Sequence, residues 1–178
     1  MTKGFFSLVF FYTLLSSLAL AADWPTWRGP YGNGSSAEAS LPSSWENGKN
    51  IVWKTDLPGA GAGSPIVLGS MIFLNSVEGD HVVGMALDTA TGEVKWKCKI
   101  GANKGFPRNG NAAQCSPVAD DKRVYFLTGL GMLTAFSHGG EPVWQRDISK
   151  EIGQFQQVFG YGATPVLVDG KLILANLI

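Results

Sequence analysis

Side chains that could carry chemistry are present in this chain, but their spacing matches no known catalytic pattern. The glycine-rich run 58–63 suggests a nucleotide-binding loop. However, Ser64 stands where the dinucleotide fingerprint needs glycine, Pro65 then opens a strand, and no lysine completes a phosphate-binding loop. His81 and His138 fall in separate units with no Cys or His at ligand spacing, and no G-x-S-x-G elbow occurs. We therefore predict no catalytic and no metal site, and interpret 58–63 as a connection between sheets.

Two long connections, 101–114 and 149–162, are better candidates for binding. Connections longer than about a dozen residues are uncommon in compact domains and are often functional. Each should join the outer strand of one sheet to the inner strand of the next, so both should emerge on the same face. The candidate ligand contacts are Arg108, Asn109, Asn111, Gln114, Phe159 and Tyr161, and the same connections carry Lys104, Phe106, Gln154 and Phe155. Amides, arginine and aromatic side chains are common in binding surfaces. The alternative is that these loops only cover one end of the sheets.

An internal repeat predicts the elements that hold these connections. A hydroxyl residue followed by proline recurs at 64–65, 116–117 and 164–165, with separations of 52 and 48 residues. Each pair precedes a short apolar stretch, a turn and a strongly apolar run, at 71–74, 124–127 and 172–175. Apolar runs bounded by turn residues are typical of strands joined in hairpins, and proline is tolerated at the first residue of a strand.

A tryptophan also recurs, at Trp53, Trp96 and Trp144. Around Trp96, residues 93–100 alternate between apolar and charged, which indicates a strand with one face in water. The same register predicts strands at 51–57 and 142–148, and places Cys98 level with Thr55 and Arg146, a position without an evident special role. Further strands are expected at 81–87 and 132–136, each followed by a turn rich in Gly or Asx residues. One unit therefore holds four strands in about 50 residues, the size of a propeller blade, and the indoles should pack between units.

Residues 86–96, Ala-Leu-Asp-Thr-Ala-Thr-Gly-Glu-Val-Lys-Trp, closely resemble the A-L-D-x-x-T-G-x-x-x-W signature of pyrroloquinoline-quinone-like (PQQ-like) propeller repeats. The second copy, 134–144, is one residue shorter and lacks the Asp and Thr. The segment Trp-Pro-Thr-Trp-Arg-Gly-Pro at 24–30 is similar to the start of exported bacterial propellers of this kind. The resemblance implies an all-β fold, a partial β-propeller of four-stranded antiparallel blades, with about two and a half blades in 51–178. The structural signature residues are Trp53, Asp88, Gly92, Trp96 and Trp144.

The family that this chain resembles includes both non-catalytic scaffolds of outer-membrane protein assembly and quinoprotein dehydrogenases. Quinone enzymes of this fold hold calcium, a catalytic carboxylate and often adjacent cysteines, and none of these can be assigned to residues of this sequence. A scaffold of that kind normally has a lipidated cysteine, which is also missing. We expect a non-catalytic binding or scaffolding module without cofactor, whose partner is a protein, glycan or small ligand. The alternative is the N-terminal portion of a dehydrogenase that uses PQQ and calcium.

The first residues predict export. Lys3, the apolar run 5–15 and the small residues 19–22 match a signal peptide over 1–22, followed by an extension over 23–50. An uncleaved membrane anchor is the alternative; after cleavage we expect no stable membrane span. The expected location is the periplasm or the outside of the cell.

Balanced charge and few cysteines narrow the remaining possibilities. The 14 basic and 14 acidic residues form no basic stripe, which argues against nucleic-acid binding. Cys98 and Cys115 fall in different predicted strands, so two buried thiols are favoured, with a disulfide as the alternative. Because the sequence stops inside the apolar run that starts at Leu172, we expect an incomplete propeller.

Overall fold

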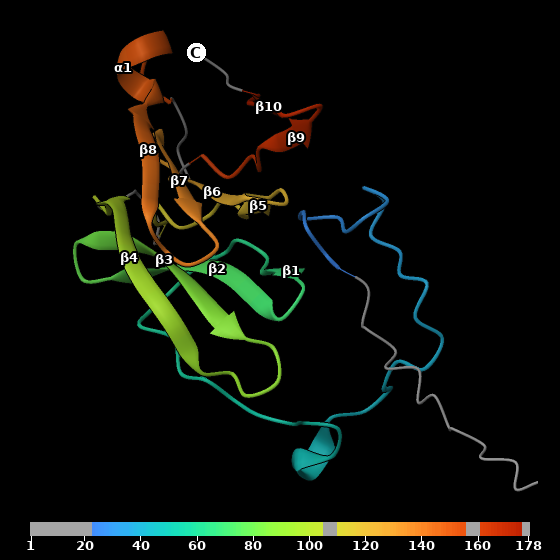
Figure 1. Cartoon of the computed structure of the whole chain (residues 1–178). Helices are drawn as coiled ribbons and strands as arrows, with labels where there is room; N and C mark the ends of the chain where they lie inside the picture. The colour runs from blue at the N-terminus through green and yellow to red at the C-terminus, as the bar shows by residue number, and fades with distance from the viewer. Residues whose placement is uncertain (1–22, 105–109, 156–160, 176–178) are drawn as a thin grey trace, which may run out of the picture.

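The computed structural model describes residues 23–104, 110–155 and 161–175, which form antiparallel sheets in chain order (Figure 1). The first sheet has the order β1-β2-β3-β4 and comprises β1 (Ile66–Leu68), β2 (Met71–Glu78), β3 (His81–Asp88) and β4 (Val94–Ala102). The second repeats this order with β5 (Val118–Ala119), β6 (Arg123–Leu127), β7 (Met132–Ser137) and β8 (Pro142–Asp147). A third hairpin consists of β9 (Val166–Val168) and β10 (Lys171–Ile173). The helices are a 3-10 turn, η1 (Glu46–Gly48), and α1 (Ile148–Ile152).

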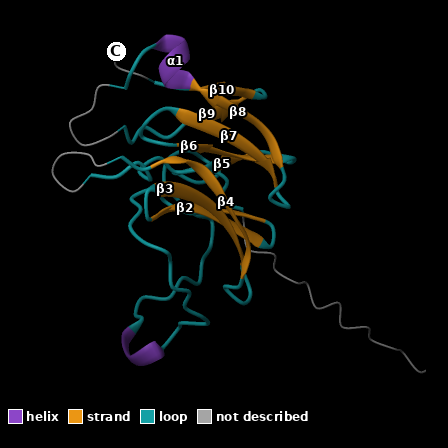
Figure 2. Ribbon diagram, turned by 90° about the vertical axis from the view of Figure 1, so that its left-hand side faces the viewer, coloured by secondary structure: helices purple, strands orange, loops and turns teal. Residues whose placement is uncertain are grey.

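The sheets pack face to face and enclose the main core. Figure 2 shows the first sheet, the second sheet and the third hairpin following one another as twisted layers. Between the first two lies a cluster of buried side chains that includes Phe73, Val82, Ala86, Phe126 and Phe136. The innermost strands β1, β5 and β9 contact one another in turn. The chain is therefore an all-β part of a β-propeller, with two complete blades and the first hairpin of a third.

The recurring tryptophans dock each sheet onto the next, as the sequence predicted. The Trp96 indole Nε1 donates to the His138 carbonyl at 2.8 Å, and its ring lies so close to Gly140 that a Cβ there would be 2.6 Å from Trp96 Cγ. Trp53 occupies the same place on the first sheet: its Nε1 donates to the Thr89 carbonyl at 2.9 Å. Trp144, on β8, lies with its ring centroid 5.8 Å from that of Tyr125 and packs on the cluster that Leu172 of the third hairpin also contacts.

The segment 51–57, predicted as a strand, pairs with no described residue, so its strand character stays a prediction. It is held by side chains instead of by a backbone ladder. Besides the Trp53 contact, Thr55 Oγ1 donates to the Gly92 carbonyl at 2.6 Å. In the next copy Cys98 Sγ donates to the Gly140 carbonyl at 3.5 Å. This position, for which the sequence indicated no special role, therefore makes an equivalent contact in both copies. Cys98 and Cys115 are both free thiols.

The hydroxyl residue before each repeat proline links neighbouring sheets. The Ser64 backbone N–H donates to Ser116 Oγ at 2.8 Å, and the Ser116 N–H donates to Thr164 Oγ1 at 3.2 Å. Since each of these N–H groups lies at the start of an inner strand, the hydroxyl of the next copy satisfies a donor that would otherwise lack a partner. This contact explains why a serine or threonine recurs at this position.

The glycine-rich run 58–63 packs closely against backbone, in agreement with its interpretation as a connection. A Cβ would fall 2.6 Å from the Val77 oxygen at Gly59, 2.8 Å from the Asn75 oxygen at Gly61 and 2.6 Å from the Cys115 oxygen at Gly63. The Ala62 N–H donates to the Ala113 carbonyl at 2.9 Å and so joins the run to the second sheet.

The predicted signal peptide, 1–22, lies outside the described residues. Within the described part of the chain, no helix has both the length and the apolar character that a membrane crossing requires.

Candidate functional site

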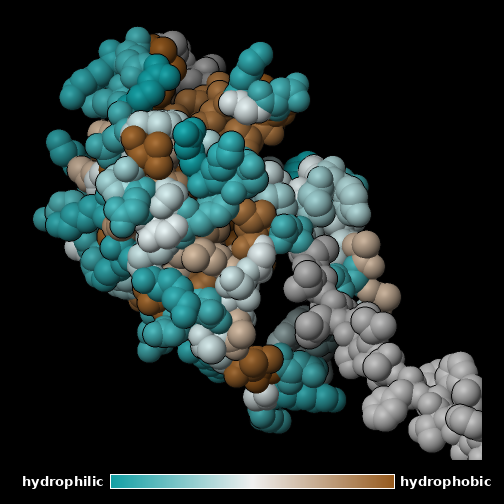
Figure 3. Space-filling model, in the orientation of Figure 1, coloured by the Kyte–Doolittle hydropathy of each residue, from teal (hydrophilic) through white to brown (hydrophobic). Residues whose placement is uncertain are grey.

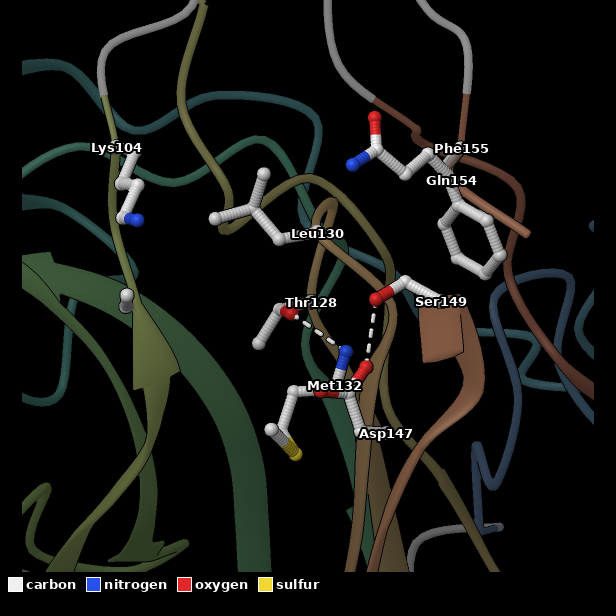
Figure 4. Close-up of a pocket in the computed structure, with 9 residues that line it drawn as sticks. Lys104, Thr128, Leu130, Met132, Asp147, Ser149, Gln154 and Phe155 are labelled. Atoms are coloured by element: carbon white, nitrogen blue, oxygen red, sulfur yellow. Dashed lines mark hydrogen bonds between the residues drawn. The ribbon is translucent and has the colours of Figure 1, made fainter. Parts of the chain in front are cut away.

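A pocket of about 400 Å³ opens between the first two sheets at the end where the long connections emerge (Figure 4). Its lining combines apolar, amide, hydroxyl and charged groups from both sheets and from the segments that follow them: Ala102, Lys104, Thr128, Leu130, Met132, Asp147, Ser149, Gln154 and Phe155. Cavities of about 300 Å³ or more are typical of small-ligand sites. In Figure 4, Lys104 lies on one wall and Ser149, Gln154 and Phe155 lie on the other.

The floor of the pocket is the turn between β6 and β7, which its own hydrogen bonds make rigid. Thr128 is only 1% exposed, and its Oγ1 accepts a hydrogen bond from the Met132 N–H at 3.1 Å. The Gly129 N–H donates to the Ala112 carbonyl at 2.8 Å, which attaches the turn to the first long connection. Leu130 and Met132 therefore reach the pocket from a fixed support.

The acidic group of the pocket is Asp147, which caps the N-terminus of α1. Its Oδ1 accepts hydrogen bonds from Ser149 Oγ at 2.6 Å and from the Lys150 N–H at 3.3 Å. Lys150 Nζ lies 3.1 Å from Asp147 Oδ2. The hydrogen bond from Ser149, followed by those from Lys150, lowers the pKa of the Asp147 carboxyl below its ordinary value. The pocket thus holds a carboxyl group with a lowered pKa on the wall across from Lys104.

The aromatic wall of the pocket has a buried support behind it. The Phe155 and Tyr161 ring centroids are 4.5 Å apart, and Tyr161 is only 2% exposed. The Tyr161 hydroxyl donates to the Ala175 carbonyl, and its own carbonyl accepts from Cys115 Sγ at 3.3 Å. Burial raises the pKa of the Cys115 thiol to about 12, so this cysteine stays protonated and unreactive at neutral pH.

The predicted ligand contacts are only partly visible. Arg108, Asn109 and Phe159 lie outside the described residues. Asn111 Oδ1 accepts a hydrogen bond from the Ala113 N–H at 2.8 Å, which fixes the end of its loop. Gln114 is half-buried and faces Gly162 from the second connection. Tyr161 reaches the pocket only through Phe155. A ligand-binding role for these residues stays a prediction.

The sequence interpretation missed the pocket residues on the β6–β7 turn and the Asp147–Ser149 cap. A signal for the cap was present, because Asp followed by Ser and Glu at the end of a strand is a common start of a helix. The turn had no such signal, since Leu130 and Met132 look like ordinary hairpin residues until the first sheet is placed beside them.

The described residues do not fit a calcium ion. Calcium takes about six to eight oxygen ligands, usually including several carboxylates, whereas the pocket offers the single carboxylate of Asp147. Across the three described ranges, no group of three or more His, Cys, Asp or Glu side chains could hold a metal ion.

Three solved structures with a similar fold are each much longer than this chain. BamB from Moraxella catarrhalis is 19% identical, with 66% of this chain and 31% of that chain covered and a TM-score of 0.44. Quinohemoprotein alcohol dehydrogenase from Comamonas testosteroni is 19% identical, covering 88% and 23%, with a TM-score of 0.57. A europium-containing methanol dehydrogenase is 16% identical, covering 85% and 27%, with a TM-score of 0.54. The chain thus spans less than a third of each, and at these identities the similarity shows the fold alone.

Sequence comparison gives the family. No curated protein matches the chain. The family model described as outer membrane protein assembly factor BamB matches residues 43–176, which is well over half of the chain. Together with the docked tryptophan repeats, this match shows that the chain belongs to the BamB family of PQQ-like β-propeller repeats.

Proposed function

We propose that this chain is a non-catalytic binding or scaffolding module of the bacterial cell envelope, and that its loop-end pocket binds a segment of a protein partner. The family description, an assembly factor for outer membrane proteins, supports a role in holding other proteins. The observation that carries the proposal is the pocket itself, which gathers side chains from both sheets and both long connections at one open end.

The chemistry of the pocket suits a polypeptide. Phe155 and Leu130 offer apolar contact, Gln154 offers an amide, and Lys104 and Asp147 offer opposite charges on different walls. Protein-binding surfaces commonly combine an aromatic anchor with a polar surround. Because Asp147 is held by Ser149 and Lys150, its carboxylate is already oriented before a partner arrives.

The proposal is tested by cross-linking in envelopes of the native host. A photoreactive amino acid replaces Gln154, which lines the pocket. In a matched control it replaces Lys97, which is exposed on β4 and does not line the pocket. We expect a discrete protein adduct from position 154 and none from position 97. Equal adducts from both positions, or adducts to glycan alone, would contradict the proposal.

A second substitution measures the contribution of the aromatic wall. Phe155→Ala in the full chain should weaken binding to the cross-linked partner by about tenfold, because it removes an apolar anchor. Arg108→Ala tests the predicted rim in the same assay. Tyr161→Ala is not a clean test, since the phenol is buried and its removal should reduce stability. An unchanged affinity of the Phe155→Ala variant for this partner would show that the pocket is not part of the binding surface.

The alternative function is the N-terminal portion of a PQQ-dependent dehydrogenase. Two dehydrogenases share the fold over most of this chain, which motivates testing this alternative. Titration with PQQ in the presence of calcium, followed by tryptophan fluorescence, separates the two functions. Saturable quenching at micromolar PQQ would favour the dehydrogenase, and no saturation is expected for a scaffold.

A further inference from the structure

The N-terminal residues 23–34 use a backbone edge that the fold repeats three times. The Trp24 N–H donates to the Val67 carbonyl at 2.7 Å, and the Val67 N–H donates to the Trp24 carbonyl at 2.9 Å. One residue further along, the Pro25 carbonyl accepts from the Ala119 N–H at 3.3 Å. The segment therefore lies across the inner edges of β1 and β5, where its blue trace passes beside both strands in Figure 1.

Val67 and Ala119 are equivalent positions, and Leu167 is the third. Val67 pairs with Ile72, Ala119 with Val124, and Leu167 with Leu172. In an antiparallel hairpin the hydrogen-bonded and non-bonded pairs alternate, so each of the three turns its N–H and C=O away from its hairpin partner. We call these outward groups the axial edge. Trp24 and Pro25 occupy it at Val67 and Ala119, whereas no backbone group of the described residues reaches it at Leu167.

A pocket of about 280 Å³ lies beside the open part of this edge. It is lined by Thr26, Trp27, Arg28 and Gly32 from the N-terminal segment and by Thr164, Pro165 and Val166 from the start of β9. The lining is mostly apolar, and Trp27 is 50% exposed. Figure 3 shows that hydrophilic side chains cover much of the molecule, while apolar surface gathers near α1 and the third hairpin. Val166 and Ile173 are among the exposed apolar side chains of that hairpin.

The cation of this pocket is available for a ligand. The Arg28 guanidinium lies 4.6 Å from the Trp27 ring centroid, and no carboxylate of the described residues pairs with it. The segment that carries it is well fixed. Gly29, with φ 71°, packs under the Trp24 ring, where a Cβ would be 2.7 Å from Trp24 Cε3, and Thr26 Oγ1 donates to the Gly29 carbonyl at 3.0 Å.

We propose that the axial edge at Leu167 and the neighbouring Trp27–Arg28 pocket bind an extended, carboxylate-bearing peptide of a partner protein. The peptide backbone adds to β9 as Trp24 already adds to β1. An apolar side chain rests on Pro165 and Trp27, and a carboxylate pairs with Arg28. Backbone addition gives affinity and the pocket gives selectivity, as in other cases of strand addition. This site shares no residue with the loop-end pocket and does not depend on it.

The test uses the full chain and a pentapeptide blocked at both ends, acetyl-Val-Thr-Val-Thr-Asp-amide, with tryptophan fluorescence and calorimetry as readouts. Two further peptides serve as controls, one ending in Asn and one N-methylated at alternate residues. We expect saturable binding with a Kd below about 1 mM, a loss of about tenfold with the Asn peptide, and no binding of the N-methylated peptide. Arg28→Gln should lower the affinity for the acidic peptide to the level of the Asn peptide. Lys122→Gln, on the exposed β5–β6 turn, should leave that affinity unchanged.

Other outcomes overturn the proposal. Equal binding of the N-methylated peptide would show that no strand is added at Leu167. Equal effects of Arg28→Gln and Lys122→Gln would reduce the interaction to general charge attraction. No binding of any peptide at about 1 mM would mean that the edge at Leu167 does not accept external chains.

Discussion

One glycine in each complete sheet allows the neighbouring tryptophan to dock. In the first sheet, Asp88 Oδ1 accepts hydrogen bonds from the Ala90 and Thr91 N–H groups, and this turn ends at Gly92 with φ 72°. In the second sheet a shorter turn ends at Gly140 with φ 91°. The signature Asp and Thr thus shape a turn whose final residue must be glycine, both for its left-handed backbone and for the indole above it.

Gly140→Ala should therefore lower the free energy of unfolding by about 2–4 kcal/mol. About half of this loss comes from a positive φ and the rest from overlap with the Trp96 ring. The matched control is Gly170→Ala, because Gly170 has φ 69° with nothing within 4 Å of an added Cβ. This variant should lower the free energy of unfolding by only about 1 kcal/mol. Urea unfolding followed by fluorescence measures both, and equal losses would show that the docking does not restrict this position.

A second prediction at this scale concerns Asp120, at the turn between β5 and β6. Burial raises the pKa of its carboxyl, but hydrogen bonds from Tyr125 and from the Lys122 and Arg123 N–H groups outweigh burial, so the pKa lies below the ordinary value of 3.8. A lowered pKa in the folded state means that the ionised form stabilises the fold above pH 3.8, and that this contribution disappears as the pH falls through the folded-state value.

Asp120→Asn should accordingly be less stable than the parent at pH 7, by roughly 0.5–1 kcal/mol after allowance for solvent screening. The difference should shrink as the pH falls below 3.8. Thermal melts between pH 7 and pH 2.5 test this, with the exposed neighbour in Asp121→Asn as the control. A stability difference that does not change with pH would contradict the assignment.

At the scale of elements, local pattern was enough wherever a strand pairs with its neighbour in sequence. The apolar runs 71–74 and 124–127 became β2 and β6, and the alternation over 93–100 became β4, with its lysines exposed. At 51–57 the same alternation occurs, but the described residues provide no partner strand. An alternating sequence shows which side chains can be buried, but a strand also needs a second backbone.

Contacts between segments far apart in the chain could not be predicted either, because local pattern does not show which segments meet. The pairing of Trp24 with Val67 and the turn that forms the pocket floor depend on how separate segments meet. The two long connections could be selected by their length and composition, and Lys104, Gln154 and Phe155 within them do line a pocket. The hairpin and cap residues that complete that pocket could not be assigned without the packing of the two sheets.

The glycine-rich run offers a prediction for a whole element. Gly61→Ala would place a Cβ 2.8 Å from the Asn75 carbonyl oxygen, a strand backbone that cannot move without disturbing β2. We expect a loss of about 1–3 kcal/mol in unfolding free energy. Gly139→Ala is the control, since its added Cβ would meet only Ser137 Oγ at 3.6 Å, and should change stability by less than about 0.5 kcal/mol. Equal effects would show that the run does not lie against β2.

At the scale of the molecule, the sheets form an angular series around the side where β1, β5 and β9 meet. This arrangement puts the long connections at one end, where the loop-end pocket opens, and puts the N-terminal segment across the inner edges. Both proposed sites therefore arise from repetition: one lies between copies of a sheet, and the other lies at an edge that recurs in each copy.

The most direct test of this account is whether successive sheets are joined by the same tryptophan contact in solution. Nuclear Overhauser measurements on the labelled chain should show the Trp53 ring close to the Gly92 α-protons and the Trp96 ring close to those of Gly140. Both indole N–H groups should exchange slowly, since they are bonded to the carbonyls of Thr89 and His138. Fast exchange of both indoles without either contact would contradict the repeated docking on which the two sites depend.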